Sequence, residues 1–246
     1  MNKRNKPGRH GGFTLVELAI VLVVVGLLLG GVMKGTDMIK KAKAERMVAD
    51  IRALAATILD YQKQRGRMPG DCNGDGFISL NPWKYDETIG VSSVTDTFSA
   101  ATTLGAICDK AADEADAGQP NLPWDELKSA GAFDMNRPNN QIARHAYDDY
   151  ISIGSVTDAT SKKTANAIFV HGVPLAVART IDAAIDPVLS DNVSTAGKTG
   201  RVRLCVLGTP TSENCGGSAV VFPTATGGNA DTKYTISYQF DVRTLP

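Results

Sequence analysis

Glu17 is the only ionisable side chain in an otherwise apolar run from Phe13 to Met33, FTLVELAIVLVVVGLLLGGVM. A carboxylate inside a membrane segment costs on the order of 2.5–3.5 kcal/mol, so Glu17 needs a cationic partner. No lysine, arginine or histidine lies within a helical turn of it. A free amine at Phe13, four residues earlier on the same helical face, would supply that charge to its own chain or to a neighbouring one. Such an amine exists only if the peptide bond after Gly12 is cleaved.

Oxygen-bearing side chains recur between residues 71 and 79, in the stretch DCNGDGFIS. Aligned with the twelve-residue calcium loop of an EF-hand, they occupy positions 1, 3, 5 and 9, with glycine at position 6. Position 7 would contribute a backbone carbonyl. The predicted Ca²⁺ ligands are Asp71, Asn73, Asp75, the carbonyl of Phe77, and Ser79.

The calcium pattern is incomplete, because position 12 is Pro82 where a bidentate glutamate is normal. Asp86 or Glu87 would substitute only if the following chain curls back. We therefore expect affinity in the millimolar range. The alternative is a solvated turn rich in Asn, Asp and Gly that follows Pro69 and Gly70.

Four cysteines, Cys72, Cys108, Cys205 and Cys215, all follow the apolar run. In an oxidising compartment an even number favours disulfides over free thiols, and four cysteines permit three pairings. We favour Cys72–Cys108 and Cys205–Cys215, because each pair closes the nearer loop. The spacing does not suit zinc, since the sequence has no C-x-x-C and no paired histidines.

The sequence contains no P-loop, no G-x-S-x-G and no H-E-x-x-H. Of the three histidines, His10 precedes the apolar run, and His145 lies among charged residues that predict a solvated surface. His171 ends a predicted strand, where a structural role is expected. The sequence therefore predicts no enzymatic activity.

The apolar run that contains Glu17 has the length of a membrane span. About 21 residues at ~1.5 Å each cover roughly 30 Å, the thickness of the hydrocarbon core. The positive-inside rule keeps the basic residues before it in the cytoplasm and sends the rest of the chain across the membrane. Those residues are Lys3, Arg4, Lys6 and Arg9. A secretory signal peptide is the alternative, but its apolar region is usually about 7–15 residues long and ends in a small-x-small cleavage site.

The stretch from Gly11 to Glu17, GGFTLVE, resembles the class III signal of type IV pilins and type II secretion pseudopilins. In that family a membrane peptidase cleaves after the glycine and methylates the new N-terminal phenylalanine. The resemblance implies cleavage after Gly12, N-methylation of Phe13, and a role for Glu17 in docking the next subunit. It covers residues 9 to about 65 well and the rest only in general plan. Many relatives have a proline in this segment, whereas this chain has none between Pro7 and Pro69.

The resemblance also implies a function, a set of partners and a location. The chain would be a structural subunit that polymerises into a type IV pilus or a type II secretion pseudopilus. Its implied partners are further copies of itself, the prepilin peptidase/methyltransferase, an inner-membrane assembly platform and membrane lipid. It would begin as a single-pass protein of the bacterial inner membrane and end in a cell-surface pilus or periplasmic pseudopilus. The alternatives are a minor pilin that contacts a surface, DNA or secreted cargo, and a monomeric membrane-anchored periplasmic domain.

Beyond Gly35 the sequence becomes amphipathic, with apolar residues at intervals of three, four or eight. These residues are Ile39, Met47, Ile51, Leu54, Ile58 and Tyr61. We predict one long helix over residues 13–65, which spans the membrane over about 13–33. A basic leader, 1–12, precedes it, and a folded domain, 66–246, follows.

Strand signals come late in the chain, where β-branched and aromatic residues gather. Strands are predicted at Ala167–His171, Val202–Leu207, Ala219–Phe222 and Tyr234–Val242. Helices are predicted at Pro123–Ser129 and Pro174–Ile185, partial helix over 95–117, and a polar loop over 186–200. The predicted fold is α+β, with a long N-terminal helix packed on a C-terminal antiparallel sheet.

The composition, 43% hydrophobic and 21% charged, is that of a folded protein. Basic and acidic residues are equal in number, at 26 each. Without the four basic leader residues, 22 basic and 26 acidic side chains remain, a net charge of −4. A mildly acidic mature chain gives no reason to expect specific nucleic-acid binding.

Overall fold

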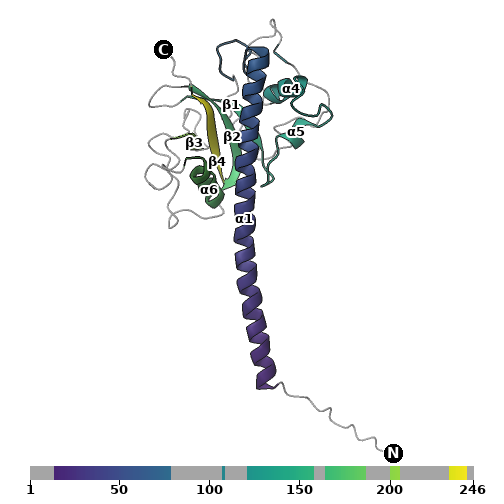
Figure 1. Ribbon diagram of the computed structural model, residues 1–246, viewed down its shortest axis with the longest axis vertical. Helices are drawn as coiled ribbons and strands as arrows, with labels where there is room; N and C mark the ends of the chain where they lie inside the picture. The colour runs from purple at the N-terminus through teal and green to yellow at the C-terminus, as the bar shows by residue number, and fades with distance from the viewer. Residues whose placement is uncertain are drawn as a thin grey trace, which may run out of the picture. The chain divides into compact units, whose positions relative to one another are not determined.

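The computed structural model describes residues 14–78, 107–108, 121–157, 164–186, 200–205 and 233–242. The chain divides into two compact units, residues 1–42 and 43–246. The described elements are α1 (Leu15–Arg65), α4 (Leu122–Ser129), α5 (Asn139–Ile142), β1 (Ile151–Thr157), β2 (Thr164–Pro174), α6 (Leu175–Ile185), β3 (Val202–Cys205) and β4 (Lys233–Val242) (Figure 1). A long helix followed by an antiparallel sheet confirms the predicted α+β fold.

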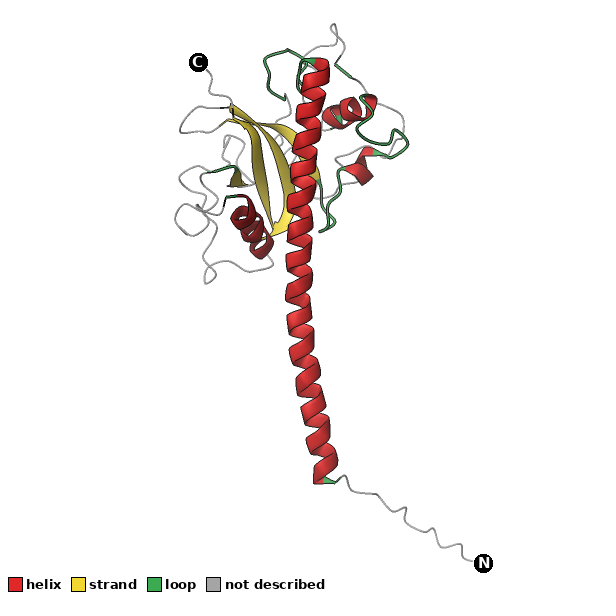
Figure 2. Cartoon of the chain, viewed as in Figure 1, coloured by secondary structure: helices red, strands yellow, loops and turns green. Residues whose placement is uncertain are grey.

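Helix α1 is continuous over 51 residues, as the absence of proline predicts (Figure 2). It begins one residue after Thr14, whose side-chain oxygen accepts a hydrogen bond from the backbone N–H of Glu17 at 3.2 Å. A threonine in this position satisfies a backbone donor that the first turn leaves unpaired. The helix ends at Arg65. The next residue, Gly66, has a φ of +77°, and its N–H donates to the Gln62 carbonyl at 2.8 Å.

The sheet has the strand order β1-β2-β4-β3, and every neighbouring pair is antiparallel. β2 lies inside the sheet and is buried almost throughout. Its residues alternate between two cores: Ile168 and Val170 belong to the larger one, and Ala167 and Phe169 to the smaller one. This period of two is the expected pattern for a strand that is covered on both faces.

One residue of β2 must be glycine. The register of β2 against β4 shifts between Val170 and Val173, and Gly172 lies in that shift with a φ of +66°. A Cβ at Gly172 would collide with the Asp149 carboxylate. The bulge therefore needs glycine both for its backbone conformation and for space.

The second unit has one main apolar core, which includes the C-terminal part of α1. Every third or fourth residue of α1 from Ala44 to Tyr61 is buried in it, and Ile58 is 0% exposed. Sheet residues such as Ile153 and Ile236 and α6 residues such as Ile181 complete the core. The amphipathic spacing predicted this burial correctly for Met47, Ile51, Leu54, Ile58 and Tyr61, but not for Ile39, which is 59% exposed.

Most predicted elements of the second unit are confirmed within the described residues. The two predicted helices correspond to α4 and α6, and three predicted strands to parts of β2, β3 and β4. The prediction missed β1, whose sequence ISIGSVT carries a glycine and two serines that weaken the strand signal. The predicted strand at 219–222 lies outside the described residues, as do most of 95–117 and of 186–200.

Candidate functional site

The first candidate site is the N-terminal part of α1. Its large apolar side chains are exposed, with Leu15 at 87%. Within the described residues, α1 is the one helix that is long and apolar enough to cross a membrane, by length and composition. Glu17 lies in its first turn and is exposed in the single chain. Gly12 and Phe13 lie outside the described residues, so cleavage and methylation there stay predictions.

The predicted disulfide between Cys72 and Cys108 is present, with a Cα–Cα distance of 5.1 Å. It joins residues 36 positions apart in the sequence. Cys205 is also disulfide-bonded, and none of the described cysteines is free. Its predicted partner, Cys215, lies outside the described residues.

The Asp71 loop, residues 71–78, is closed by hydrogen bonds to its own carboxylates. Asp71, which is 1% exposed, accepts from the N–H of Gly74 at 2.7 Å and of Gly76 at 2.9 Å. Asp75 accepts from the N–H of Phe77 at 2.7 Å and from the Asn73 amide at 2.9 Å. All four carboxylate oxygens therefore have a donor within the loop.

This loop brings three of the predicted calcium ligands, Asp71, Asn73 and Asp75, into one turn, while Ser79 lies outside the described residues. No group of three or more His, Cys, Asp or Glu side chains in the described part of the chain is placed to hold a metal ion. Two carboxylates that already accept N–H bonds form a weak donor set for Ca²⁺, which takes six to eight oxygens. Calcium binding therefore stays a prediction.

Glu126 of α4 holds together segments that are far apart in the sequence. Its buried carboxylate pairs with the Arg67 guanidinium at 2.6 and 2.9 Å. It also accepts hydrogen bonds from the Tyr61 hydroxyl at 3.2 Å, the Gly70 N–H at 2.7 Å and the Cys108 N–H at 3.0 Å. The end of α1, the turn before the Asp71 loop and the disulfide thus meet at one carboxylate.

The electrostatics of this cluster are those of a structural ion pair. The hydrogen bond to Glu126 raises the pKa of Arg67 above its ordinary value. Burial, assisted by the Glu126 charge, raises the pKa of Tyr61 to about 12. Neither group changes its charge near neutral pH, so the cluster is suited to holding the fold and not to transferring protons.

Two further charged residues of α4 are buried beside this cluster. Lys128 is fully buried, and its ammonium lies 3.5 Å from Asp125 and 3.3 Å from the Arg137 carbonyl. The Asn139 amide donates to Asp125 at 2.9 Å. Sequence pattern alone gave no hint of this burial, because the Arg67 side chain, the Arg137 carbonyl and the Asn139 amide all lie outside α4.

Ser152 and His171 have the spacing of a nucleophile and a base, with Oγ and Nε2 2.9 Å apart. Both side chains are buried, and His171 also contacts the Thr235 hydroxyl at 3.2 Å through Nδ1. Burial, with a smaller contribution from His145, lowers the pKa of His171 to about 3. Because a catalytic base needs access to substrate and a pKa near the working pH, this pair is not suited to nucleophilic catalysis.

His145 was expected on a solvated surface, and that prediction is wrong. It is buried, and its Nε2 donates to the His171 carbonyl at 2.7 Å while its Nδ1 accepts from the Tyr147 N–H at 3.2 Å. One donating and one accepting nitrogen define the neutral ring. Burial lowers the pKa of His145, which agrees with that state.

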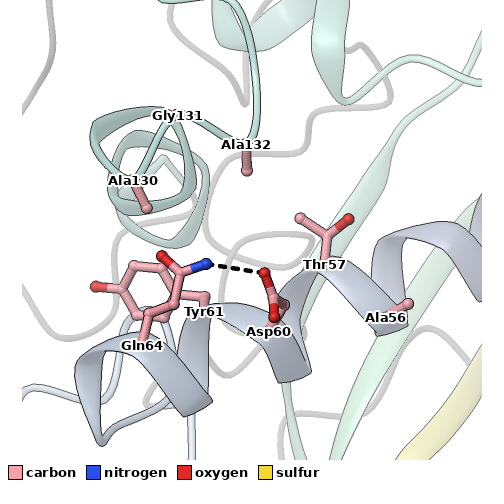
Figure 3. Close-up of a pocket in the computed structure, with 8 residues that line it drawn as sticks. All are labelled: Ala56, Thr57, Asp60, Tyr61, Gln64, Ala130, Gly131 and Ala132. Atoms are coloured by element: carbon pink, nitrogen blue, oxygen red, sulfur yellow. Dashed lines mark hydrogen bonds between the residues drawn. The ribbon is translucent and has the colours of Figure 1, made fainter.

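A hollow of about 410 Å³ lies between α1 and the end of α4 (Figure 3). Its walls include Thr57, Asp60, Tyr61 and Gln64 from α1 and the residues from Ala130 to Ala132. The Gln64 amide donates to Asp60 at 2.8 Å across its floor. The lining offers no pairing of a nucleophile with a base, and it gives no indication of a catalytic role.

Comparison with known proteins bears on the N-terminal segment alone. No curated protein and no solved structure matches the chain. Residues 8–33 match the family model described as the prokaryotic N-terminal methylation motif. This match confirms the resemblance drawn from GGFTLVE: residues 8–33 are the class III prepilin signal of type IV pilins and pseudopilins.

Proposed function

We propose that this chain is a subunit of a helical filament, either a type IV pilus or a type II secretion pseudopilus. The observation that carries the proposal is the methylation motif at residues 8–33, which overlaps a helix whose apolar side chains are exposed. The motif by itself points to a pilin-type structural protein that is processed by a prepilin peptidase.

The exposed apolar surface of α1 supports assembly on physical grounds. Burying one Val, Leu or Ile side chain is favourable by about 1.5–3 kcal/mol, and many such side chains lie exposed between Leu15 and Met33. Lipid covers them while the chain is in the membrane. In a filament the same surface packs against the helices of neighbouring subunits, so the chain can leave the bilayer without exposing it to water.

Glu17 provides the specificity that an apolar surface lacks. Cleavage after Gly12 creates an amine at Phe13, and N-methylation leaves that amine positively charged. A neighbouring subunit brings this charge to Glu17, and a paired carboxylate is far less costly in an apolar environment than an isolated one. The pairing sets the axial position of each subunit relative to the last.

The test is the variant Glu17→Ala in a strain that lacks its own copy of the chain. We expect normal membrane insertion and normal leader removal, because Glu17→Ala removes a charge from an apolar segment. The yield of sheared filaments should fall at least about tenfold, because losing an unscreened ion pair costs more than ~1.4 kcal/mol of free energy at each subunit contact. Intact mass should give a mature chain that begins at N-methylated Phe13.

Asp37→Ala is the matched control, because Asp37 is an exposed acid of the same helix that lies beyond the apolar run. Its filaments should form at wild-type abundance. Wild-type filament yield from Glu17→Ala would disprove the docking role. A mature chain that begins after residue 30 would show ordinary signal-peptidase cleavage and would overturn the filament function itself.

A further inference from the structure

An amine, an amide and a carboxylate are buried together between α4 and α5. Lys128, in the last turn of α4, is 0% exposed, and it is the one buried lysine among the described residues. Asn139, the first residue of α5, is 1% exposed, and Asp125 is 3% exposed. A lysine is seldom buried completely unless it is paired, so the partners of Lys128 show what this group can do.

The Asp125 carboxylate contacts both of the other groups through one oxygen. Its Oδ1 lies 3.5 Å from the Lys128 Nζ and accepts a hydrogen bond from the Asn139 Nδ2 at 2.9 Å. The Asn139 Nδ2 also donates to the Asn121 side chain at 3.0 Å, and the Lys128 Nζ donates to the Arg137 carbonyl at 3.3 Å. The amine and the amide nitrogen are therefore neighbours on the same carboxylate oxygen.

The Asn139 side-chain carbonyl oxygen is buried and has no hydrogen-bond donor. A buried carbonyl without a donor is unfavourable. The amide nitrogen, in contrast, is held by two acceptors. A reaction that leaves a proton on Asp125 would place a donor beside this amide, where the structure has only acceptors.

We propose that the Lys128 amine and the Asn139 side-chain amide form an intramolecular amide bond, with Asp125 as the catalytic residue. The bond between the Lys128 Nζ and the Asn139 Cγ forms, the bond between the Asn139 Cγ and Nδ2 breaks, and ammonia leaves. The reaction oxidises and reduces nothing. It requires only a folded second unit and does not depend on filament assembly.

Asp125 moves the protons in this reaction. It first takes a proton from the Lys128 ammonium, which leaves a neutral amine that can attack the Asn139 Cγ. It then gives that proton to Nδ2, the atom that it already contacts, so that the leaving group is ammonia. A second proton passes from Nζ to Asp125. The product has one amide N–H and a protonated Asp125, and both buried charges are gone, which is favourable because buried charges are costly.

Burial favours this reaction over its competitors. Since Lys128 is 0% exposed, solvent does not reach the amine, and exclusion of water protects the reacting groups from side reactions. The lysine side chain is flexible, so rotation of its terminal bonds can carry Nζ from Asp125 toward Cγ, one bond beyond Nδ2. The product bond joins the last turn of α4 to the first residue of α5 and closes the segment between them covalently.

The test is peptide mapping of the mature full chain, purified from membranes in detergent, with a protease that cleaves before aspartate. This cleavage puts Lys128 and Asn139 in separate peptides, 125–133 and 134–147. In the wild type we expect the two peptides to remain joined, with a mass about 17 Da below the sum of the two, the mass of one ammonia. Fragmentation should place the link between Lys128 and Asn139.

Lys128→Gln and Asn139→Ala should abolish the joined species. Asp125→Asn keeps the size of the side chain but cannot relay protons, so the joined species should fall at least about tenfold, with tryptophan fluorescence as the check on folding. The matched controls are Lys63→Gln and Asn136→Ala, which change exposed residues of the same types and should leave the wild-type yield.

Two separate, unmodified peptides from the folded wild-type chain would overturn the proposal, whether or not the variants fold. A link to Asn136 or Asn140 would also overturn it. A loss of about 18 Da within peptide 125–133 would show that Lys128 reacts with Asp125 instead and releases water. A wild-type yield from folded Asp125→Asn would disprove the catalytic role of Asp125.

Discussion

Residues 15–33 and residues 44–61 belong to the same helix and have opposite burial. In the first stretch the apolar side chains are exposed on every side of α1. In the second stretch one stripe is buried, and the exposed residues are polar side chains and alanines. A stripe needs one apolar partner, and the sheet and α6 supply it. A helix that is apolar all round must be surrounded, by lipid or by other helices. The two stretches therefore differ in the kind of partner that they need.

The difference extends to charge. The second unit buries several ionisable groups, and some of them have a partner from a distant part of the sequence, as Glu126 has in Arg67 and His145 in the His171 carbonyl. Glu17 lies in the apolar stretch, and its predicted partner is an amine that only processing creates. Folding within one chain satisfies the first kind of group, and assembly satisfies the second.

The largest effect on the folded unit should come from Glu126→Ala. Its loss leaves a guanidinium and two backbone N–H groups without their acceptor, which should lower the free energy of unfolding by about 3–5 kcal/mol. The measurement is denaturant unfolding of the full chain in detergent, followed by tryptophan fluorescence.

The control for Glu126 is Asp50→Ala, which breaks an exposed pair with Arg46 that is 3.8 Å long. Exposed pairs contribute about 0–1 kcal/mol, so this variant should unfold near the wild-type midpoint. Similar losses in the two variants would show that the buried network has no special role.

A second experiment makes the same change in both stretches of α1. Ile58→Ala removes a fully buried side chain and should cost about 2–5 kcal/mol in the unfolding of the second unit. Leu28→Ala removes an exposed one and should change that unfolding by less than about 0.5 kcal/mol. If Leu28→Ala destabilises the unit as strongly, the two stretches do not differ as described.

The sequence predicted what depends on local pattern. The 51-residue helix follows from hydrophobic periodicity and the absence of proline, and the first disulfide from the shorter loop. The methylation motif was evident because its few residues are adjacent in the chain. Each of these signals lies within a short stretch of sequence.

The sequence did not predict what depends on distant partners. Glu126 and Lys128 look like surface residues of a short helix, and their burial becomes favourable only through Arg67 and the Arg137 carbonyl. His145 looked exposed for the same reason, since the His171 carbonyl that accepts its N–H is 26 positions away. Strand β1 was missed because pairing with β2 outweighs its weak intrinsic preference.

A smaller effect should appear in the pH dependence of the second unit, where two buried groups act in opposite directions. Burial, assisted by Asp186, raises the pKa of Asp182 to about 6, and burial lowers the pKa of His171 to about 3. As pH falls from 6 toward 3.8, native Asp182 takes up a proton before the unfolded chain does, which stabilises the fold. As pH falls below 6.5, the unfolded chain protonates His171 and the native state does not, which destabilises it.

Asp182→Asn should reveal this compensation. At pH 7 the variant should be more stable than wild type by about 1–3 kcal/mol, because an uncharged amide replaces a desolvated carboxylate. The gain should shrink as pH falls and vanish near pH 4, as measured by unfolding across that range. Asp50→Asn, at an exposed position, should show no such trend. A constant difference between Asp182→Asn and wild type from pH 7 to pH 4 would contradict the assignment.

The smallest effect should be that of calcium on the Asp71 loop, because the hydrogen bonds that close the loop already satisfy both carboxylates. Bound Ca²⁺ therefore adds little to the stability of a loop that is already closed. If the dissociation constant is in the millimolar range, Ca²⁺ at ten times that constant stabilises the fold by about 1.4 kcal/mol. The full chain in detergent should therefore unfold at a slightly higher temperature in 10 mM CaCl₂, about ten times that constant, than with chelator.

Asp75→Asn keeps an acceptor for the Phe77 N–H and removes one charge, so it should abolish the calcium response and leave the midpoint with chelator unchanged. Asp71→Ala should lower the midpoint in both conditions, because it opens the loop itself. Identical wild-type midpoints with and without calcium would identify residues 71–78 as a turn held by its own hydrogen bonds.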